Sequence, residues 1–377
     1  MNSTVLRLFM ALTALAALPF PAFAGEGEEK QPRWYESLNA AAGITTVIQG
    51  TSGNDYGDYK DRTDYAYSAD VELSTEIKPG HGFFIVFETG DGDGANDNLG
   101  SRSIPNYDAF IAIVEGEQRL NVSQAYYEGA FAGGAVTLDI GKMDHHAITD
   151  TNAYANDETA QFVNGLFVRS AGVVFPEHEN YYAYTIALTL RPVDFVSLII
   201  AYAKHETEDI FNKGMTVAEL GLHPVISGSQ GNYRIVYLNH DNGYTDYRTG
   251  ESKSGTGFVI SADQALGDYL GVFARYAQAD DTIEQFQVKS AISGGAQVNG
   301  SAWGLEADAL GIAYGKLELN KDLVTENNDG ESVAEVYYRH QVAENFGLTA
   351  DGQFFSNLER PEKRNVSVFS LRAQADF

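Results

Sequence analysis

The last twelve residues, Val366-Ser-Val-Phe-Ser-Leu-Arg-Ala-Gln-Ala-Asp-Phe377, alternate in character at every second position. The side chains at 369, 371, 373, 375 and 377 are apolar, and those between them are polar. Because strand side chains alternate between two faces, this segment presents one apolar and one polar surface. A half-buried strand of a soluble sheet shares the pattern, but closing strands of outer-membrane barrels add a final aromatic residue, here Phe377. The pattern therefore predicts a transmembrane antiparallel β-barrel.

The N-terminus predicts export. Arg7 is the only charged side chain in residues 1–24, residues 8–18 are almost entirely apolar, and Ala22-Phe23-Ala24 is a small-residue cleavage pattern. These are the three parts of a secretory signal peptide, and the apolar stretch is too short for a membrane helix. We expect residues 1–24 to be a signal peptide and residues 25–377 to form one barrel domain in the bacterial outer membrane.

Composition also favours a barrel. The chain has 38 Gly, 22 Tyr and 21 Phe but only 9 Pro, and it has no Cys. Tyrosine and phenylalanine form the aromatic girdles of membrane barrels. No stretch after the signal peptide reaches the roughly 18 continuous apolar residues that a membrane helix needs. The exported chain is thus expected to be either a barrel or a soluble β-protein.

The net charge of −27 excludes nucleic acid as an expected partner, because a phosphate-binding surface is basic. Acidic runs at 91–97 and 280–284 fall in predicted loops. One interpretation is that they only keep the loops solvated. The other is that they form the mouth of a pore that favours cations.

Segments of about ten alternating residues recur along the chain, separated by alternately short and long connections. The clearest hairpin joins 64–77 to 82–89 through Lys78-Pro79-Gly80. Long acidic or Gly-rich connections, such as 90–106 and 280–299, are predicted external loops. About 353 residues at roughly 22 per strand and connection predict about 16 strands, with 14 to 18 allowed, around a water-filled pore. Further hairpins are predicted at 181–204, 257–279 and 333–355.

Several short blocks resemble the carbohydrate-selective porins of the OprB type over residues 120–377. Their order and spacing carry the resemblance, rather than any one block. The resemblance implies a 16-stranded pore that passes sugars passively. The blocks are Gly141-Lys142-Met143-Asp144, Asp150-Thr151-Asn152, Ala155-Asn156-Asp157-Glu158, Gln161-Phe162, Ser254-Gly255-Thr256-Gly257, Gly271-Val272-Phe273-Ala274-Arg275-Tyr276, Glu335-Val336-Tyr337-Tyr338-Arg339 and Leu348-Thr349-Ala350-Asp351-Gly352-Gln353.

Polar residues at the inward positions of these strands are the candidate pore-lining and substrate-contact groups. Charged and amide side chains can exchange hydrogen bonds with sugar hydroxyls, and the arginine fork can also hold carboxylates in place. The alternative is that Glu335, Arg339, Asp351 and Arg372 form a ladder of ion pairs that stiffens the wall. The candidates are Lys142, Asp144, Asn156, Glu158, Gln161, Arg275, Glu335, Arg339, Asp351, Gln353 and Arg372, with Asp376 also on the polar face of its strand.

The segment 142–161 is the candidate channel-narrowing loop, because it is too long for a hairpin and rich in polar groups. It either folds into the lumen or stays outside as a loop whose side chains satisfy its own backbone. His145 and His146 are adjacent, so on a strand they would point apart, and no third metal ligand is evident. The Asp-rich stretch 91–98 breaks the EF-hand spacing. We expect no metal site and no cofactor.

The favoured function is an outer-membrane porin for passive diffusion of small hydrophilic solutes, with carbohydrates favoured by the resemblance and no enzymatic activity. A non-specific, cation-preferring general porin is the alternative. A barrel enzyme would need a Ser or acidic dyad with a histidine, and no spacing among the eight His selects such a pair. A barrel adhesin would bind a partner through its long loops. Expected partners are sugars, ions, outer-membrane lipid and the barrel-assembly machinery through Phe377, and a homotrimer is compatible with this width.

Overall fold

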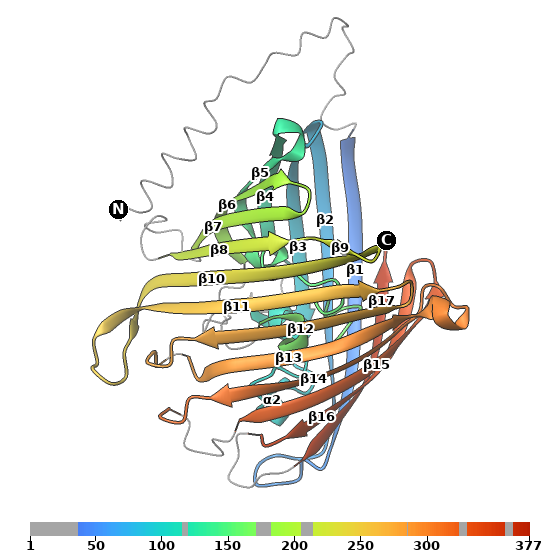
Figure 1. The fold of residues 1–377 in the computed structure, drawn as a ribbon. Helices are drawn as coiled ribbons and strands as arrows, with labels where there is room; N and C mark the ends of the chain where they lie inside the picture. The colour runs from blue at the N-terminus through green and yellow to red at the C-terminus, as the bar shows by residue number, and fades with distance from the viewer. Residues whose placement is uncertain are drawn as a thin grey trace, which may run out of the picture.

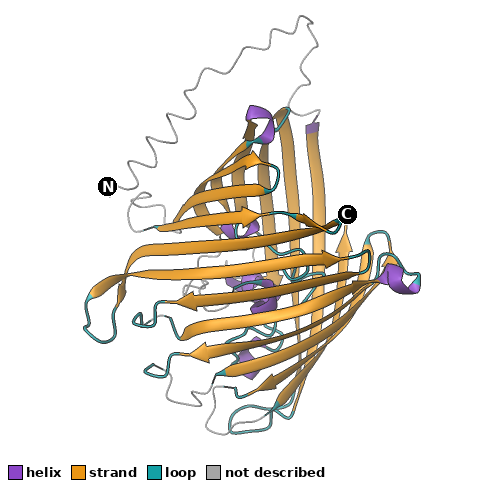
Figure 2. Cartoon of the chain, viewed as in Figure 1, coloured by secondary structure: helices purple, strands orange, loops and turns teal. Residues whose placement is uncertain are grey.

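The computed structural model describes residues 37–114, 120–170, 182–204, 214–284, 286–323, 330–358 and 365–377. The predicted signal peptide, residues 1–24, lies outside these ranges. Figures 1 and 2 show long antiparallel strands arranged as a barrel, with short helices inside it. Within the described ranges, no helix has the length and apolar character to cross a membrane.

The strands follow one another around the barrel in chain order. They are β1 (Leu38–Ser52), β2 (Thr63–Lys78), β3 (His81–Asp91), β4 (Asn121–Phe131), β5 (Val136–Asp144), β6 (Tyr182–Val193), β7 (Val196–Lys204), β8 (Met215–Leu222), β9 (Val225–Ile226), β10 (Ser229–Thr245), β11 (Ser252–Leu266), β12 (Leu270–Ala279), β13 (Val288–Asn299), β14 (Ala309–Leu319), β15 (Glu331–Ala343), β16 (Phe346–Ser356) and β17 (Val366–Asp376). The helices are α2 (Asn96–Leu99), α3 (Tyr107–Val114) and α4 (Gly165–Val168), with short 3₁₀ turns η2 (Ala132–Gly134), η3 (His145–Ala147) and η5 (Gly300–Trp303).

The sheet closes on itself because β1 pairs with both β2 and β17. β9 has two residues and pairs, like β8, with β10, so it extends the β8 position. The described part of the chain thus forms a closed barrel of sixteen antiparallel strands, which confirms the predicted fold class and strand number. Among the described strands, closure gives each of the sixteen a partner on both sides, which satisfies the backbone groups that a bilayer cannot.

The register across the closure separates an apolar outer face from a buried inner face that mixes apolar and polar side chains. Ile48 lies between Tyr65 and Leu371, and these three side chains are 48%, 58% and 54% exposed. One residue earlier, Val47 lies between Ala66 and Arg372, all fully buried. The alternation predicted for 366–377 is therefore present, with its apolar face on the outside of the barrel.

The two ends of the barrel differ. Tight turns join β2 to β3, β6 to β7, β11 to β12 and β15 to β16, as predicted. Gly80 and Gly267 adopt φ of 75° and 67° in two of these turns, a conformation that glycine reaches without strain. We call this end, where Phe377 also lies, the short-turn end. The long connections lie at the opposite, long-loop end (Figure 1).

The prediction that 280–299 is an external loop is wrong for most of its length, because Val288–Asn299 forms β13. The glycines there indicate close packing rather than a loop. A Cβ added to Gly295 would lie 2.4 Å from the carbonyl oxygen of Ile312 and 2.7 Å from the ring of Phe273. A small residue is needed where a neighbouring aromatic side chain covers the strand, and the sequence alone does not separate this cause from a turn.

Two long connections turn into the barrel. The segment 92–114 carries α2 and α3, and residues 145–170, which we call the inner segment, carry α4. Their apolar side chains form one core with the inner face of β12 to β17. That core includes Leu99, Tyr107, Phe162, Leu166, Phe167, Phe273, Leu317, Val333, Tyr337 and Val368.

The outward face makes a direct prediction for stability in lipid. Leu371 lies at the middle of β17, so Leu371→Arg should lower the unfolding free energy by about 2–4 kcal/mol in vesicles. Ser74→Arg places the same charge on the lumen face of β2 and should change it by about 0.5 kcal/mol or less. Urea titration of the protein in lipid vesicles measures both, and equal losses would contradict the assigned faces.

Candidate functional site

The inner segment begins and ends with polar caps. The Asp144 carboxylate accepts a hydrogen bond of 2.8 Å from the His146 backbone N–H at the start of η3. The Asn164 side chain accepts one of 3.0 Å from the Leu166 N–H at the start of α4. These caps satisfy backbone donors that a short helix leaves unpaired. The segment is thus locally folded as well as held by the wall.

Arg275 on β12 is the main anchor of the inner segment. Its guanidinium donates to the carbonyl oxygens of Ala155 at 2.6 Å, Phe167 at 2.5 Å and Asp150 at 2.9 Å. Its Nε also lies 3.3 Å from Oδ1 of Asp150, and the side chain is buried. One planar cation therefore binds backbone from three positions of the segment, which suits the fixed fork of arginine.

The opposite side of the segment is held by β15 and β17. Oε1 of Glu335 accepts from the Val163 N–H at 2.6 Å, and Oε2 accepts from the Asn164 N–H at 3.1 Å. Arg372 donates to the carbonyl oxygen of Glu158 at 2.7 Å and to that of Gln161 at 2.8 Å. The wall supplies a carboxylate where the segment has free N–H groups, and a guanidinium where it has free carbonyl groups.

Gln353 connects both inward-folded segments. Its Nε2 donates to the carbonyl oxygen of Pro105 at 2.8 Å, and its Oε1 accepts from Nδ2 of Asn164 at 3.0 Å. Asp351, two residues earlier on β16, accepts from the hydroxyl of Ser370 at 3.2 Å. Glu331 accepts from the backbone N–H groups of Arg102 and Ser103. The inward carboxylates and amides of β15 and β16 thus mainly position chain inside the barrel.

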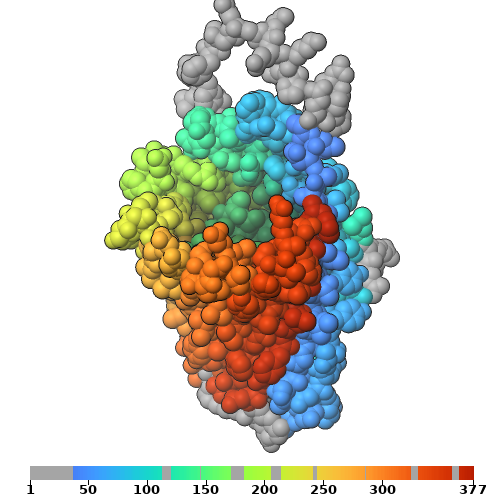
Figure 3. Space-filling model, turned by 90° about the vertical axis from the view of Figure 1, so that its right-hand side faces the viewer, coloured from blue at the N-terminus to red at the C-terminus, as the bar shows by residue number. Residues whose placement is uncertain are grey.

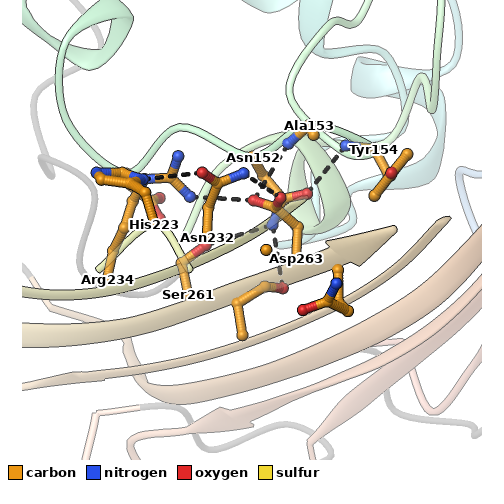
Figure 4. Close-up of polar contacts among 12 residues, drawn as sticks. Asn152, Ala153, Tyr154, His223, Asn232, Arg234, Ser261 and Asp263 are labelled. Atoms are coloured by element: carbon orange, nitrogen blue, oxygen red, sulfur yellow. Dashed lines mark hydrogen bonds and ion pairs between the residues drawn. The ribbon is translucent and has the colours of Figure 1, made fainter. Parts of the chain in front are cut away.

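A second polar network holds the start of the inner segment against β8, β10 and β11 (Figure 4). Asp263 accepts from Nη1 of Arg234 at 3.0 Å, from Nδ2 of Asn232 at 2.6 Å and from the Ala153 N–H at 3.3 Å. Glu219 accepts from the Asp150 N–H at 2.8 Å and lies 3.7 Å from Nε of Arg234. These charges are buried, and each has an opposite charge and further hydrogen bonds, as buried ions require.

Aromatic side chains fill the space between the anchors. The Phe162 ring lies 4.9 Å from that of Tyr337 in an edge-on arrangement, and 5.6 Å from that of Phe273. Phe167 is 5.3 Å from Phe162. All four are buried, so the inner segment is packed against one side of the lumen and not suspended in it.

The structure brings together most of the sequence-predicted site residues, but in an anchoring role. Arg275, Glu335, Gln353 and Arg372 bind the inner segment directly, so neither free sugar contacts nor a simple wall ladder describes them. Within the segment, Oε1 of Gln161 accepts from the Asn156 N–H at 2.8 Å, and Arg169 donates to the Asn156 carbonyl oxygen at 3.0 Å. The remaining candidates, Glu158 and Asp144, lie in or next to this segment.

Three predicted residues lie apart from this cluster. Lys142 lies two residues after Ile140, which is 43% exposed, so both side chains lie on the outer face of β5. The Lys142 ammonium donates to the carbonyl oxygen of Val122 at 3.1 Å. Arg339 is partly exposed on the lumen phase of β15, toward the short-turn end. Asp376 is exposed near the chain end, within 3.5 Å of Gln374.

The lumen wall along β2 to β5 is acidic and partly aromatic. Phe83 and Ile85 are 48% and 40% exposed on the outside of β3, so Phe84 between them faces the lumen. Its ring stacks on that of Tyr126, with centroids 4.9 Å apart and planes at 12°. The lumen phases of β2 to β5 also carry Asp70, Glu72, Glu128 and Asp139.

The sequence did not single out several of these residues. Nothing in the sequence indicates that the start of the inner segment lies against β8, β10 and β11. Sequence patterns therefore did not identify the residues that hold it there, which are Asp263, Glu219 and Asn232. Phe162 and Tyr337 belonged to the family-like blocks but were not assigned a role. The inward phase of an alternating strand is the signal that could have identified Glu219. Among the described residues, no group of three His, Cys, Asp or Glu side chains is arranged to hold a metal ion.

A closed sixteen-strand barrel with long loops at one end and chain folded into its lumen defines the class of outer-membrane porins. Similarity to a known protein family agrees with this class. The model of the carbohydrate-selective porin, OprB family, matches residues 56–377, so the chain belongs to the OprB family.

Individual relatives are more distant. An uncharacterized protein of Aquifex aeolicus (strain VF5) is 26% identical over 286 residues, which are 74% of this chain and 78% of that protein. The high-pH structure of Pseudomonas putida OprB has a TM-score of 0.76 at 16% identity, covering 91% of this chain and 95% of that one. A triple mutant of the Rhodopseudomonas blastica porin has a TM-score of 0.57 at 13% identity, covering 90% of this chain and 100% of that one. These two structures support the fold.

The anchors predict a change in pore size. Arg275→Ala leaves Oδ1 of Asp150 and three carbonyl groups without their guanidinium donor, so we expect a loss of about 3–5 kcal/mol in unfolding free energy. It should also raise the single-channel conductance, because the inner segment is released. Arg62→Ala, which removes a half-exposed arginine paired with Asp64 in a loop, is the control and should do neither. Unchanged conductance in a folded Arg275→Ala barrel would contradict the anchoring role.

Glu158 predicts a pH dependence. It is partly exposed to the lumen, and loss of hydration among protein atoms raises its pKa to about 8. Arg169 opposes this rise, whereas Asp157 and Asp108 add to it. Because the pKa is raised, Glu158 is neutral at pH 6 and gains its charge as the pH rises toward 9.

We therefore expect the K⁺ over Cl⁻ permeability ratio to increase from pH 6 to pH 9. Reversal potentials in a salt gradient measure this ratio. Glu158→Gln should flatten the increase without changing the ratio at pH 6. An identical pH profile in the variant would show that Glu158 does not contribute.

Proposed function

We propose that the protein lets small hydrophilic solutes diffuse passively across the outer membrane, with carbohydrates as favoured solutes. The observation that carries this is the divided lumen. Anchored chain covers the inner face of β12 to β17, and α3 packs on the long-loop halves of β2 and β3. The short-turn halves of β2 to β5 present an aromatic stack beside carboxylates. Sugars have hydroxyl groups that bind carboxylates and C–H faces that pack on aromatic rings. Family membership supports the carbohydrate preference as a general expectation.

Planar-bilayer recordings test this proposal. Sugars that enter the lumen should lower the single-channel current with a saturable dependence on concentration. Tyr126→Ala removes one face of the aromatic stack and should raise the half-saturating concentration by about 2- to 13-fold, a range set by the usual contribution of one aromatic contact. Tyr127→Ala, on the outward phase of the same strand, is the matched control. A current that no sugar changes would contradict the carbohydrate preference, although the protein would still be a pore.

A non-specific, cation-preferring porin is the second candidate, and the acidic wall favours it. Asp70 and Glu72 on β2, Glu128 on β4 and Asp139 on β5 share the lumen phase. Carboxylates along a narrow aqueous path concentrate cations there. Glu72→Gln combined with Glu128→Gln should lower the K⁺ over Cl⁻ permeability ratio. If this double variant keeps the full ratio, the preference arises from the loops instead.

The remaining assignments are also inferences. We infer that residues 1–24 are removed on export, that 25–377 form the barrel domain, and that Phe377 contacts the assembly machinery. The fold and family are those of a transport channel, and we infer no catalytic activity. A homotrimer is a further inference, which cross-linking in native membranes tests.

A further inference from the structure

A polar cavity of about 390 Å³ lies between the start of the inner segment and the wall at the short-turn end. We call it the rim pocket. Figure 3 shows the hollow mouth of the barrel, with green-coloured residues from the middle of the chain inside it. Cavities of roughly 300–1,000 Å³ hold small organic ligands. The pocket is lined by Thr151 of the inner segment and by Thr189, Ser197, Glu219, His223 and Arg234 of the wall, among others.

A chain of hydrogen bonds in the rim pocket fixes the position of each proton. Nδ2 of Asn232 donates to Asp263, because a carboxylate accepts. The Asn232 oxygen therefore faces His223, whose Nδ1 lies 2.8 Å away and must carry the hydrogen. In the neutral ring, Nε2 is then an acceptor, and Ser197 Oγ at 2.8 Å donates its only hydrogen to it.

This proton arrangement makes Ser197 an acceptor toward the cavity. Its hydroxyl hydrogen is used by His223, so the lone pairs of Oγ remain for a ligand hydroxyl. Thr151 and Thr189 supply hydroxyls that donate or accept, and Arg234 supplies guanidinium N–H groups. Donors and acceptors thus line the same cavity, which matches a molecule with many hydroxyl groups.

The local backbone leaves room for this pair. Gly221 lies opposite Ser197 on the neighbouring strand β8. A Cβ at Gly221 would lie 2.4 Å from Oγ of Ser197 and 2.8 Å from Nε2 of His223. Any larger residue at 221 would displace the Ser197–His223 pair, so the site depends on this glycine.

The charge balance of the rim pocket selects a neutral ligand. Arg234 lies within ion-pair distance of both Glu219 and Asp263, so its positive charge is offset inside the wall. Arg191 and Asp194, which also line the cavity near the turn, have opposite signs. An anionic or a cationic solute would therefore lose hydration without meeting an unpaired opposite charge, so a neutral solute binds more tightly.

We propose that the rim pocket is a second solute site, separate from the aromatic stack, which binds one neutral polyhydroxylated ring of hexose size at the short-turn mouth. This proposal rests on the proposed function. Ser197 accepts from a ring hydroxyl, Thr189 exchanges a hydrogen bond with another, and His223 and Asn232 are positioning residues that fix the Ser197 hydrogen. A solute held here lies next to the inner segment, at one end of its path through the barrel.

The test uses the full-length mature barrel in planar bilayers with glucose added to one side at a time. Ser197→Ala removes the acceptor, and Thr189→Val removes a lining hydroxyl with little change of shape. Each should raise the half-saturating glucose concentration on the short-turn side by about 3- to 10-fold, as the loss of one hydrogen bond implies. Thr185→Val makes the same change on the same face of β6, outside the rim pocket, and should leave the value unchanged.

Glucose uptake by proteoliposomes separates the possible failures. Uptake with unshifted saturation in both pocket variants overturns the rim pocket and leaves the proposed function standing. Uptake without any saturation in the wild type overturns both the rim pocket and the carbohydrate preference, and leaves only a passive pore. If a heat-modifiable, conducting barrel takes up no glucose, both the rim pocket and the proposed function are overturned. Gluconate, which has a similar size and a carboxylate, should saturate the current only at higher concentration, and equal values would overturn the neutral-ligand assignment.

Discussion

The backbone hydrogen bonds between β1 and β17 are the contact on which the other features depend. In lipid, an unpaired strand edge leaves N–H and C=O groups without partners, each at a cost of several kcal/mol. Pairing of Gly43–Ser52 with Ser367–Asp376 removes both edges and creates an enclosed lumen. That enclosure gives the strands an inner face, and it supplies the wall against which the inner segment packs.

The polar side chains inside the barrel provide hydrogen-bond partners for the chain that the barrel encloses. Chain that enters the lumen carries backbone groups of its own, and these need partners. Arg275 and Arg372 meet carbonyl oxygens, whereas Glu335 meets N–H groups. The same residues therefore do not line an open channel as free charges. The short-turn halves of β2 to β5 carry carboxylates and the Phe84–Tyr126 stack on their lumen phase, and this is where we propose that solutes pass.

The barrel could be predicted because one residue in two must be apolar on any lipid-facing strand, and this pattern survives in a single sequence. The resemblance correctly indicated the OprB family. Alternation placed Arg275, Glu335 and Arg372 on the inner face, but it did not indicate that they hold the inner segment. Their partners could not be predicted, because Val163 or Phe167 is brought to the wall only by tertiary folding. The Ser197–His223 pair was missed for the same reason, since 26 residues separate the two side chains. The error at 288–299 arose because glycine marks both loops and close packing.

The most direct test of the central claim is whether the inner segment lies in the conduction path. The natural chain has no cysteine, so Ala153→Cys, an exposed position on the inner segment, gives a single reactive site. A cationic methanethiosulfonate reagent should then lower the single-channel conductance in one step. Ala125→Cys on the outer surface of β4 should show no step. Complete modification at position 153, verified by mass, with unchanged conductance would contradict the account.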